Sequence, residues 1–434
     1  MTFRNSYITF LFILGISLQN LTAQDNWMMQ WQGIQQTYIN PAYTSEKSWE
    51  ISAASTALDF QLGNLNAGDF IEKNTAGVNI ISLNRLASAI DGKSDLMATG
   101  QFNTIDVVHR IGSITFSAGH GINYEFATSL NPTLIDILAN GNASYIGKTV
   151  ELGMPASASV YQKFYLGAAI KTGPVNIGVR AAYLNGWHHM HTEKLSSQLT
   201  TGAEYYELTI ANDIEIYNAG IFEYRGIDDI ETIKGINDYR SLFTANHGMA
   251  FDLGLELKLS DNSGIFVSAQ NLGSIKWADR AQKLTNNTTT TLKGIDIEKV
   301  IDGEEDASIE DTILSVFSLK QENLEFSQKV AARYNAGGYF SLAGTTFSAL
   351  FNFKDLSNIQ KASVHLQASR PVLSWLDLGV NYQWRSDAAF NLGVMAKTEF
   401  GPVVLFGVCN NAWSLLNPSR LDGLSGRVGA YVGF

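Results

Sequence analysis

Three histidines near the middle of the chain are the first residues that could do chemistry. His188, His189 and His191 lie within four positions, and Glu193 follows them. Imidazoles together with a carboxylate are ligands that zinc accepts, provided that they are fixed in one shell. These residues come directly after Trp187, just beyond the end of a predicted strand, where a structural role is the simpler interpretation. We therefore expect no metal site and no bound cofactor.

A serine and a histidine on one strand face are the second candidate for chemistry. Ser363 and His365 stand two positions apart, so an extended chain points both side chains to the same side. Nucleophilic catalysis needs a nucleophile, a base and an orienting carboxylate brought together. The chain contains no G-x-S-x-G, H-E-x-x-H or G-x-x-x-x-G-K-[ST] motif. We therefore expect no enzymatic activity and assign no catalytic or cofactor-binding residue.

An acidic run occupies residues 302–311. It lacks the glycine position and the ligand spacing of a calcium-binding loop, so a solvated charged segment is the simpler interpretation. The whole chain carries a formal net charge of −11 and has no basic stripe that could neutralise phosphates. Binding to DNA or RNA depends on such a stripe. We therefore expect no nucleic-acid partner.

The elements that must position these residues are strands with a strict two-residue period. Residues 376–385 alternate five apolar side chains with five small or polar ones. The same alternation recurs in 175–183, 251–259 and 362–369, and it ends the chain in 427–434. Alternation over about ten residues is typical of a strand that crosses a membrane with one face toward lipid and the other toward a lumen.

Strand length separates a barrel from a soluble β-sandwich. Ten residues rise roughly 33 Å, and a tilt of about 45° shortens this span to the apolar thickness of an outer membrane. Sandwich strands average about 5 to 6 residues. The segments from 343 to 434 also follow one another as hairpins with short turns, as an up-and-down barrel requires. We therefore predict an all-β fold, a transmembrane antiparallel β-barrel of about 14 strands (about 12–16).

The amino terminus indicates export from the cytoplasm. Arg4 precedes an apolar run from Ile8 to Leu18, and small and polar residues lead to Gln24 as the first mature residue. This is the pattern of a secretory signal peptide, which we assign to residues 1–23. From Gln24 onward no apolar window approaches about 18 residues, which excludes helical membrane spans.

The mature chain divides into a tail and a barrel. Cys409 is the single cysteine, so no intramolecular disulfide can form. Asn40-Pro41 marks a turn, because proline fixes its own φ and biases the preceding residue away from helix. We expect this turn to separate a periplasmic N-terminal tail, residues 24–48, from an outer-membrane barrel, residues 49–434. Tyr38 and Trp31 are placed to tuck the tail into the periplasmic mouth of the barrel.

Three stretches within the barrel do not read as strands. Residues 64–92 and 131–150 mix loop residues with short helical periodicity, and 281–326 is a long acidic segment in which 295–301 has helical spacing. We expect short helical insertions on strand-to-strand connections. Connections longer than about 15 residues are usually functional or disordered, so a specific activity is expected there or in the lumen. The sequence leaves open whether these insertions face the exterior, face the periplasm or fill the barrel.

Charged residues on the polar strand faces are the candidates for lining or sealing the lumen. These residues include both positive and negative charges, which suits either a closed polar network or a selective path for a solute. They are Arg180, Asp252, Glu256, Lys258, Asp377 and Arg385. About 14 strands leave a lumen of modest width.

Aromatic residues at strand ends are expected to mark the membrane interfaces. Trp187, Trp277, Trp384 and Trp413 stand at such ends. The last residue, Phe434, is in phase with the lipid-facing positions of the final strand. We interpret Phe434 as an assembly signal for the barrel insertion machinery.

Five segments have a recognisable pattern of strand and turn residues. They are QTYINPA at 36–42, GNASYIGK at 141–148, FDLGLELKLS at 251–260, AQNLGSIKW at 269–277 and GPVVLFGVCNNAWSLLNP at 401–418. Together they resemble a family of uncharacterised outer-membrane barrels in Bacteroidota. That family is similar to the PorP/SprF membrane proteins associated with type IX secretion and gliding. The resemblance covers nearly the whole mature chain. It implies a barrel in the outer membrane and a role as partner of secreted, surface-held proteins, and it implies no catalytic residues.

Two functions from different classes follow as expectations. In the first, the barrel is a structural or assembly component whose loops anchor an exported protein at the cell surface. In the second, the alternative, it is a transport pore for a small or hydrophobic solute. A plugged lumen would favour the first. The expected partners are outer-membrane lipid, the barrel insertion machinery and an exported surface protein.

Overall fold

The computed structural model describes residues 33–434 except 76, 91, 93, 227–228, 233–242, 293–315, 317, 357–358 and 386–390. The signal peptide, Trp31, the helix expected within 295–301 and the acidic run lie outside the described residues.

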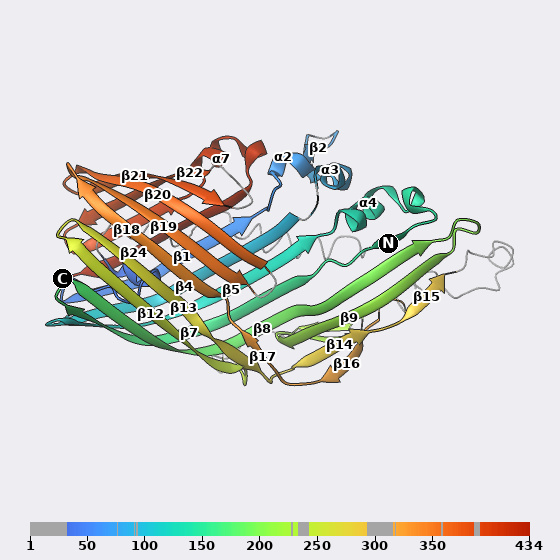
Figure 1. The fold of residues 1–434 in the computed structure, drawn as a ribbon, viewed down its shortest axis with the longest axis horizontal. Helices are drawn as coiled ribbons and strands as arrows, with labels where there is room; N and C mark the ends of the chain where they lie inside the picture. The colour runs from blue at the N-terminus through green and yellow to red at the C-terminus, as the bar shows by residue number, and fades with distance from the viewer. Residues whose placement is uncertain are drawn as a thin grey trace.

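Fourteen antiparallel strands close into a barrel, which confirms the predicted fold (Figure 1). Each strand pairs with the next in the wall, and the last, β24, pairs with the first, β1. In order around the wall they are β1 (Trp49–Gln61), β4 (Ser94–Ile111), β5 (Ile114–Leu130), β7 (Ala156–Thr172), β8 (Val175–Thr201), β12 (His247–Ser260), β13 (Ser263–Trp277), β18 (Ala332–Leu342), β19 (Thr345–Leu356), β20 (Ile359–Leu373), β21 (Leu376–Arg385), β22 (Asn391–Phe400), β23 (Val403–Cys409) and β24 (Gly423–Gly433). Closure satisfies the backbone of every wall strand, as a membrane requires.

Tight turns join the strands at the end of the barrel that also holds Trp49 and the carboxyl terminus. Ala343 and Gly344 have φ of 49° and 77°, the two positive values of a type I′ hairpin turn. We call this end the turn end and the opposite end the loop end. In outer-membrane barrels, short turns face the periplasm and longer loops face the exterior.

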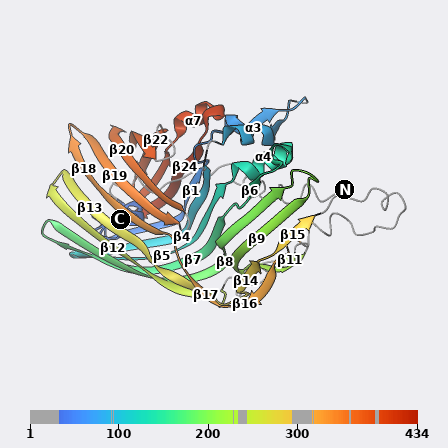
Figure 2. The ribbon, with the colours of Figure 1, turned by 45° about the vertical axis from the view of Figure 1, so that its right-hand side comes forward.

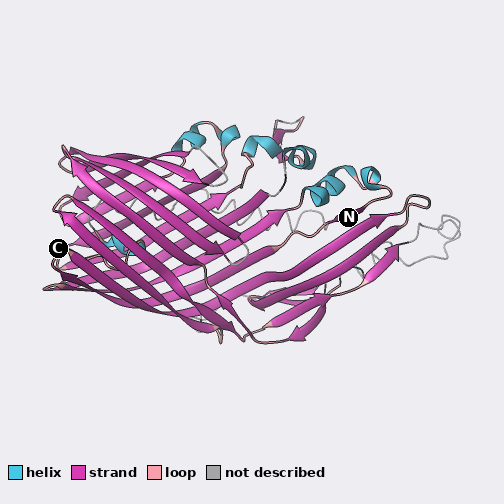
Figure 3. Cartoon of the chain, viewed as in Figure 1, coloured by secondary structure: helices cyan, strands magenta, loops and turns pink. Residues whose placement is uncertain are grey.

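Short helices gather at the loop end (Figure 3). The β1–β4 connection holds α2 (Ala67–Phe70), β2 (Ile71–Lys73), β3 (Asn79–Ile81) and α3 (Leu83–Ala89). The β5–β7 connection holds α4 (Pro132–Asn140), η4 (Ala143–Tyr145) and β6 (Thr149–Glu151), and the β23–β24 connection holds α7 (Ala412–Leu416) and η6 (Pro418–Arg420). The helical insertions predicted in 64–92 and 131–150 are confirmed, although 64–92 also contains the short strands β2 and β3. Their place at the end opposite the carboxyl terminus was not predictable from the sequence.

On one side the wall continues beyond the loop end as an extension (Figure 2). The carboxyl half of β8 leaves β12 and pairs with β9, which pairs in turn with β14 and β15. The added elements are β9 (Leu208–Gly220), β10 (Phe222–Gly226), β11 (Asp229–Thr232), β14 (Gln282–Asn286), β15 (Thr289–Leu292), β16 (Lys320–Asn323) and β17 (Phe326–Lys329). The expectation that 281–326 contains no strands is therefore wrong, because its short strands pair with residues far away in the sequence.

The outer face of the barrel is apolar and the inner face is mostly polar. Along β12, Phe251, Leu253 and Leu255 are 50%, 48% and 42% exposed, whereas Asp252 and Glu256 are buried. Water-soluble monomers rarely expose so continuous an apolar surface. The architecture is therefore that of an outer-membrane β-barrel, with lipid against the exposed side chains.

Helical membrane spans are a separate question. Across the residues that the structure describes, no helix is long and apolar enough to cross a membrane.

Trp277 does not lie at a membrane interface, where the sequence analysis expected it. It is 1% exposed, packed inside the barrel against Gly186. A β-bulge on β13 at Asn271, whose φ is 58°, inserts one residue and reverses which side chains face inward beyond it. Trp384, at the end of β21, is 44% exposed, and Trp413 is 55% exposed but lies on α7 in the β23–β24 connection.

Candidate functional site

The tail that precedes the first strand lies inside the barrel. We call residues 33–48 the N-terminal plug. Its single turn of 3₁₀-helix, η3 (Ile34–Tyr38), is buried at every residue, and Ile39 and Asn40 are 1% and 4% exposed. The described part of the tail therefore fills lumen space between wall strands that lie far apart in the sequence.

The Asn40-Pro41 turn seats the plug against β8 and β12. The Asn40 side chain accepts a hydrogen bond from the Ala42 amide (3.0 Å) and donates one to the Leu255 carbonyl oxygen (3.4 Å). A Cβ atom at Gly178 would collide with the carbonyl group of Pro41, and one at Gly254 would collide with the Asn40 side chain. The two glycines therefore leave the room that the turn occupies.

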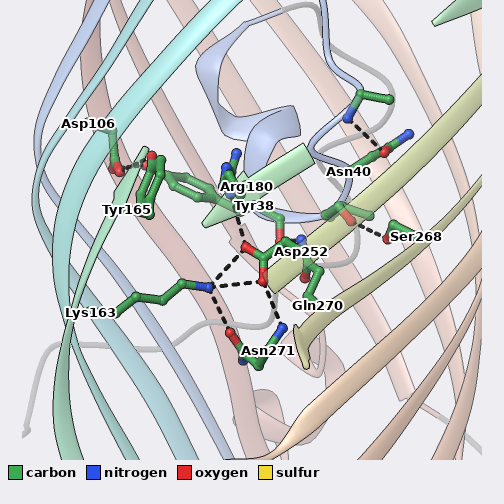
Figure 4. Close-up of polar contacts among 12 residues, drawn as sticks. Tyr38, Asn40, Asp106, Lys163, Tyr165, Arg180, Asp252, Ser268, Gln270 and Asn271 are labelled. Atoms are coloured by element: carbon green, nitrogen blue, oxygen red, sulfur yellow. Dashed lines mark hydrogen bonds and ion pairs between the residues drawn. The ribbon is translucent and has the colours of Figure 1, made fainter. Parts of the chain in front are cut away.

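Side chains of the wall hold the backbone of the plug (Figure 4). Ser268 Oγ donates to the Ile39 carbonyl oxygen at 2.5 Å, and Gln270 Nε2 donates to the Tyr38 carbonyl oxygen at 3.2 Å. Asn335 Nδ2 also donates to Ile39, at 3.3 Å. These bonds satisfy carbonyl groups that the short helix leaves free, as buried backbone requires.

Tyr38 is the polar anchor of the plug. Its hydroxyl donates to Asp106 Oδ2 at 2.6 Å, and Tyr165 donates to the other oxygen of the same carboxylate at 2.6 Å. The Arg427 guanidinium lies over the Tyr38 ring, 4.3 Å from its centre. Burial and the neighbouring Asp106 carboxylate raise the pKa of Tyr38 well above its ordinary value. The hydroxyl therefore stays protonated and keeps donating throughout the neutral range.

A buried charge cluster lies beside this anchor. Lys163 Nζ is 3.0 Å and Arg180 Nη1 is 3.8 Å from Asp252 Oδ2. The Asn271 backbone amide donates to Asp252 at 2.7 Å, and Lys163 donates to the Asn271 side chain at 2.7 Å. The bulge at Asn271 is what aims this amide at the carboxylate. Buried charges persist when they are paired and hydrogen-bonded in this way.

An apolar layer packs against the plug nearer the turn end. Ile34, Ile39 and Tyr43 of the plug contact it. The wall side chains that form it are Val108, Phe266, Leu350, Met395, Val404, Phe406, Val408 and Tyr431. The lumen is therefore not uniformly polar, contrary to the simple alternation of apolar outside and polar inside.

The space left around the plug is small. The cavity between Tyr38, Lys163 and Asp252 has a volume of about 30 Å³, and a second one near Ile39 has about 10 Å³. Roughly 10–15 Å³ is needed to hold one water molecule. In this conformation the cavities that border the plug hold water molecules at most, and no open passage for a solute lies among them.

The structure brings two of the six predicted lumen residues together. Arg180 and Asp252 stand directly opposite each other on β8 and β12 and form the ion pair described above. Glu256 accepts hydrogen bonds from Asn176 at 2.7 Å and Tyr339 at 3.0 Å, nearer the turn end.

The other three predicted lumen residues lie apart from this cluster. Asp377 pairs with Lys397 at 3.1 Å, and Arg385 pairs with Asp422 at 3.1 Å. Lys258 is partly exposed near the turn end of β12. The six residues therefore do not form one site.

Sequence reasoning missed the residues that hold the plug. The sequence predicts only that Tyr38 tucks the tail into the mouth of the barrel, and it predicts no contact with the tail for Asp106, Lys163, Tyr165 or Arg427. Strand alternation could have placed these four on the lumen side. Their contact with Tyr38 or with each other depends on how strands that are distant in the sequence pair around the barrel.

The histidines and the serine considered first have structural surroundings. His189 contacts His191 at 2.9 Å and Ser159 at 2.6 Å, and the described residues contain no group of three or more potential ligands that could hold a metal. Ser363 Oγ and His365 Nε2 do meet, at 3.0 Å. The cavity beside Ser363 has a volume of about 10 Å³, which leaves no room for a substrate.

Comparison with known proteins gives a family. Residues 41–410 match the family described as "Family of unknown function (DUF5723)". No curated protein matches the chain. The match covers most of the barrel and begins at Pro41, within the plug.

Among solved structures the chain is similar to outer-membrane barrels. They include the Pseudomonas putida toluene transporter TodX (8% identity, TM-score 0.40, 95% of each chain covered) and a Pseudomonas aeruginosa FadL homologue (9%, 0.42, 95% of this chain and 97% of the other). The translocator domain of the autotransporter NalP from Neisseria meningitidis is a third (9%, 0.33, 90% of each). Likenesses this distant carry no argument about the function of this chain.

Proposed function

The chain belongs to this family of unknown function, DUF5723, and we propose that it is an outer-membrane channel for a small solute, closed by its own N-terminal segment. The observation that carries the proposal is a plug, residues 33–48, that occupies the lumen of a closed barrel without being a strand of its wall. A plugged lumen was expected from the sequence to favour the assembly role, but a plug that is separate from the wall can also act as a gate. Of the two functions expected from the sequence, this is the alternative. We also propose the bacterial outer membrane as its location.

The way in which the plug is held supports movement. The plug is not part of the wall ladder. It is held by side-chain hydrogen bonds from Ser268, Gln270 and Asn335, by the Tyr38 anchor and by packing against the apolar layer. Each such bond has a modest net value of about 1 kcal/mol, and bonds to charged groups reach about 1.5–3 kcal/mol. A group of this size can be released together without breaking the barrel, whose strands keep their own hydrogen bonds.

The surfaces around the plug indicate the chemistry of the solute. On one side of the plug is the apolar layer that includes Phe266 and Phe406, and on the other is the charge cluster around Asp252. A passage opened between them would offer apolar contact nearer the turn end and hydrogen-bonding groups farther from it. A small, partly apolar solute fits such a path better than a strongly charged one.

A second function, anchoring an exported protein, is favoured by the extension. β8 has 27 residues, whereas about 9–11 residues suffice to cross a membrane. The excess carries a sheet beyond the loop end, where β9 presents a surface outside the membrane. The resemblance to PorP/SprF proteins points the same way, and we keep this role as a proposal beside the channel.

Solute flux into liposomes tests the channel. The wild-type barrel and a variant lacking residues 34–43 are reconstituted, and swelling is followed with uncharged solutes of graded size and polarity. We expect slow swelling with the wild type and at least tenfold faster swelling with the variant. Equal swelling rates would mean that the plug does not close a path through the barrel, and they would contradict the proposed gated channel.

Replacing 281–326 with a short turn separates the two functions. The wall pairing between β13 and β18 does not involve this segment, so the barrel is expected to fold. If the extension holds a partner, an exported protein that co-purifies with the wild type is lost with this variant. If the barrel is a channel alone, flux is unchanged and no partner is lost.

A further inference from the structure

A groove lies on the outer face of the barrel, over β13, β18, β19 and β20. We propose that it binds one phospholipid of the periplasmic leaflet, with an acyl chain over Gly338 and Ala349 and the phosphate group at Arg370. This is a ligand site on the lipid-facing side of the wall, distinct from the lumen.

The shape of the groove follows from strand register. Ile265, Gly338, Ala349 and Leu366 stand directly opposite one another on β13, β18, β19 and β20. Two small residues thus lie between two large ones, which makes a floor with a wall on either side. The groove has a volume of about 600 Å³, within the range of roughly 300–1,000 Å³ that is usual for ligand pockets.

Aromatic side chains limit the groove toward the turn end. Phe340 and Phe347 stack there, with ring centres 5.2 Å apart. The next position on β20 is Ala368, which stands opposite Phe347 and is small. A chain can therefore leave the groove past Ala368 and continue along β20, while the rings close the rest of that end.

Arg370 is the residue that this route reaches. It is exposed on the same face of β20 as Leu366, and its partner on β21 is Leu378. Four residues along a strand correspond to about 13 Å, close to half of the roughly 30 Å apolar thickness of a bilayer. A guanidinium in an apolar face is costly unless it reaches the headgroup level. There it can bind a phosphate with two parallel hydrogen bonds.

The charge at Arg370 also argues for a lipid over a second copy of the chain. A symmetric contact centred on the groove would bring the same surface patch from both copies together. Such a contact would bring the positive charges of two Arg370 side chains to the same edge of the interface, and it would supply no negative group for either of them. A phospholipid brings an apolar chain and a negative phosphate in one molecule, and it matches both features.

Native mass spectrometry of the full-length barrel tests the site. The protein is purified in mild detergent, exposed to dioleoyl phosphatidylglycerol, and stripped at increasing collision energy. We expect one lipid to remain on the wild type after the others are lost. Ala349→Leu, which fills the floor, should lower its occupancy at least fivefold, and Arg370→Glu should do the same.

Matched variants give the controls. Ala336→Leu adds the same bulk at an exposed position of β18 outside the groove and should leave the lipid in place. Arg370→Lys keeps the positive charge and should retain most of the lipid. Ala349→Ile, with a side chain that strands favour, is the second groove-filling variant, and heat-modifiable migration on gels shows whether each variant is folded.

Three results would overturn the proposal. One is a wild type that keeps no lipid. Another is folded Ala349→Leu and Ala349→Ile variants that keep as much lipid as Ala336→Leu. The third is a wild-type dimer that the groove-filling variants abolish, because a second copy of the chain would then be the occupant.

Discussion

At the scale of single residues, one hydroxyl group joins the plug to the wall. Tyr38→Phe removes the hydrogen bond to Asp106, while Tyr165 and Asn103 still donate to that carboxylate. A hydrogen bond to a charged group is worth about 1.5–3 kcal/mol. We expect amide hydrogen exchange of residues 34–43 to speed up about tenfold or more, with the wall strands unchanged.

Tyr145→Phe is the matched control for this change. Tyr145 also donates to a carboxylate, Asp136 Oδ2 at 2.7 Å, but in the β5–β7 connection at the loop end. It should leave exchange in the plug as it is in the wild type. If both variants had the same effect on residues 34–43, Tyr38 would not be an anchor.

Gly178 gives a second prediction at this scale. Gly178→Ala places a methyl group against the Pro41 carbonyl, so the turn of the plug must move. We expect a cysteine placed at Ala42, which is fully buried, to react faster with a maleimide when this methyl group is present, in a Cys409→Ser background.

Gly407→Ala is the control for Gly178→Ala. A Cβ atom there would have its nearest neighbour at 3.6 Å, an ordinary contact, and the residue lies on β23 away from the plug. Maleimide labelling at position 42 should be as slow as without the change. Equally slow labelling with Gly178→Ala would mean that the turn does not depend on this glycine.

The sequence predicts the positions of some of these residues but not their contacts. Arg180 and Asp252 could be assigned to the lumen from alternation alone, because each lies on a long regular strand. That they meet depends on the register between β8 and β12, which the pattern of each strand alone does not contain. Tyr38 could be recognised as part of a motif with a turn, but not as the partner of Asp106, which is 68 residues away.

At the scale of elements, Phe434 extends the pairing between β24 and β1 that closes the wall. The backbone amide and carbonyl of Phe434 pair with those of Trp49 at 3.0 and 2.9 Å, and its side chain is 63% exposed. If the aromatic side chain is the assembly signal, Phe434→Ala should reduce the folded barrel in the outer membrane several-fold. Phe434→Tyr should preserve it, as measured by heat-modifiable migration of membrane fractions.

Two further variants separate the signal from general effects. Deleting Phe434 also removes the two hydrogen bonds to Trp49 and should be at least as severe as Phe434→Ala. Phe400→Ala, at another exposed aromatic residue of the turn end, should have little effect. Normal assembly of the Phe434→Ala variant would mean that the aromatic side chain is not an assembly signal and that the residue contributes only its backbone pairing with Trp49.

The elements that the sequence predicts well are those with long alternation. Residues 376–385 and 251–259 match β21 and β12 closely, because ten residues in register leave no other interpretation. The strands of 281–326 were missed because each has four or five residues and pairs with β9 or β14 rather than with a neighbour in sequence. Trp277 was misplaced because a one-residue bulge leaves no clear mark in the apolar pattern.

At the scale of the whole molecule, closure and filling are separate properties. Closure into about 14 strands is predictable, since a strand that crosses a membrane must pair on both sides. The filling is not, because the plug is a short segment whose residues read as an ordinary tail with one turn. Its seat is made by residues of β4, β7, β8, β12, β13, β18 and β24. A sequence without structural information does not show that these meet.

The ionic current through single barrels in a planar bilayer tests the central claim most directly. The claim is that residues 33–48 close the lumen of a barrel that spans the membrane. We predict that the wild type is silent or opens briefly, and that the variant lacking residues 34–43 carries a steady current. A wild type that conducts as steadily as this variant, or a folded variant that remains silent, would contradict the claim.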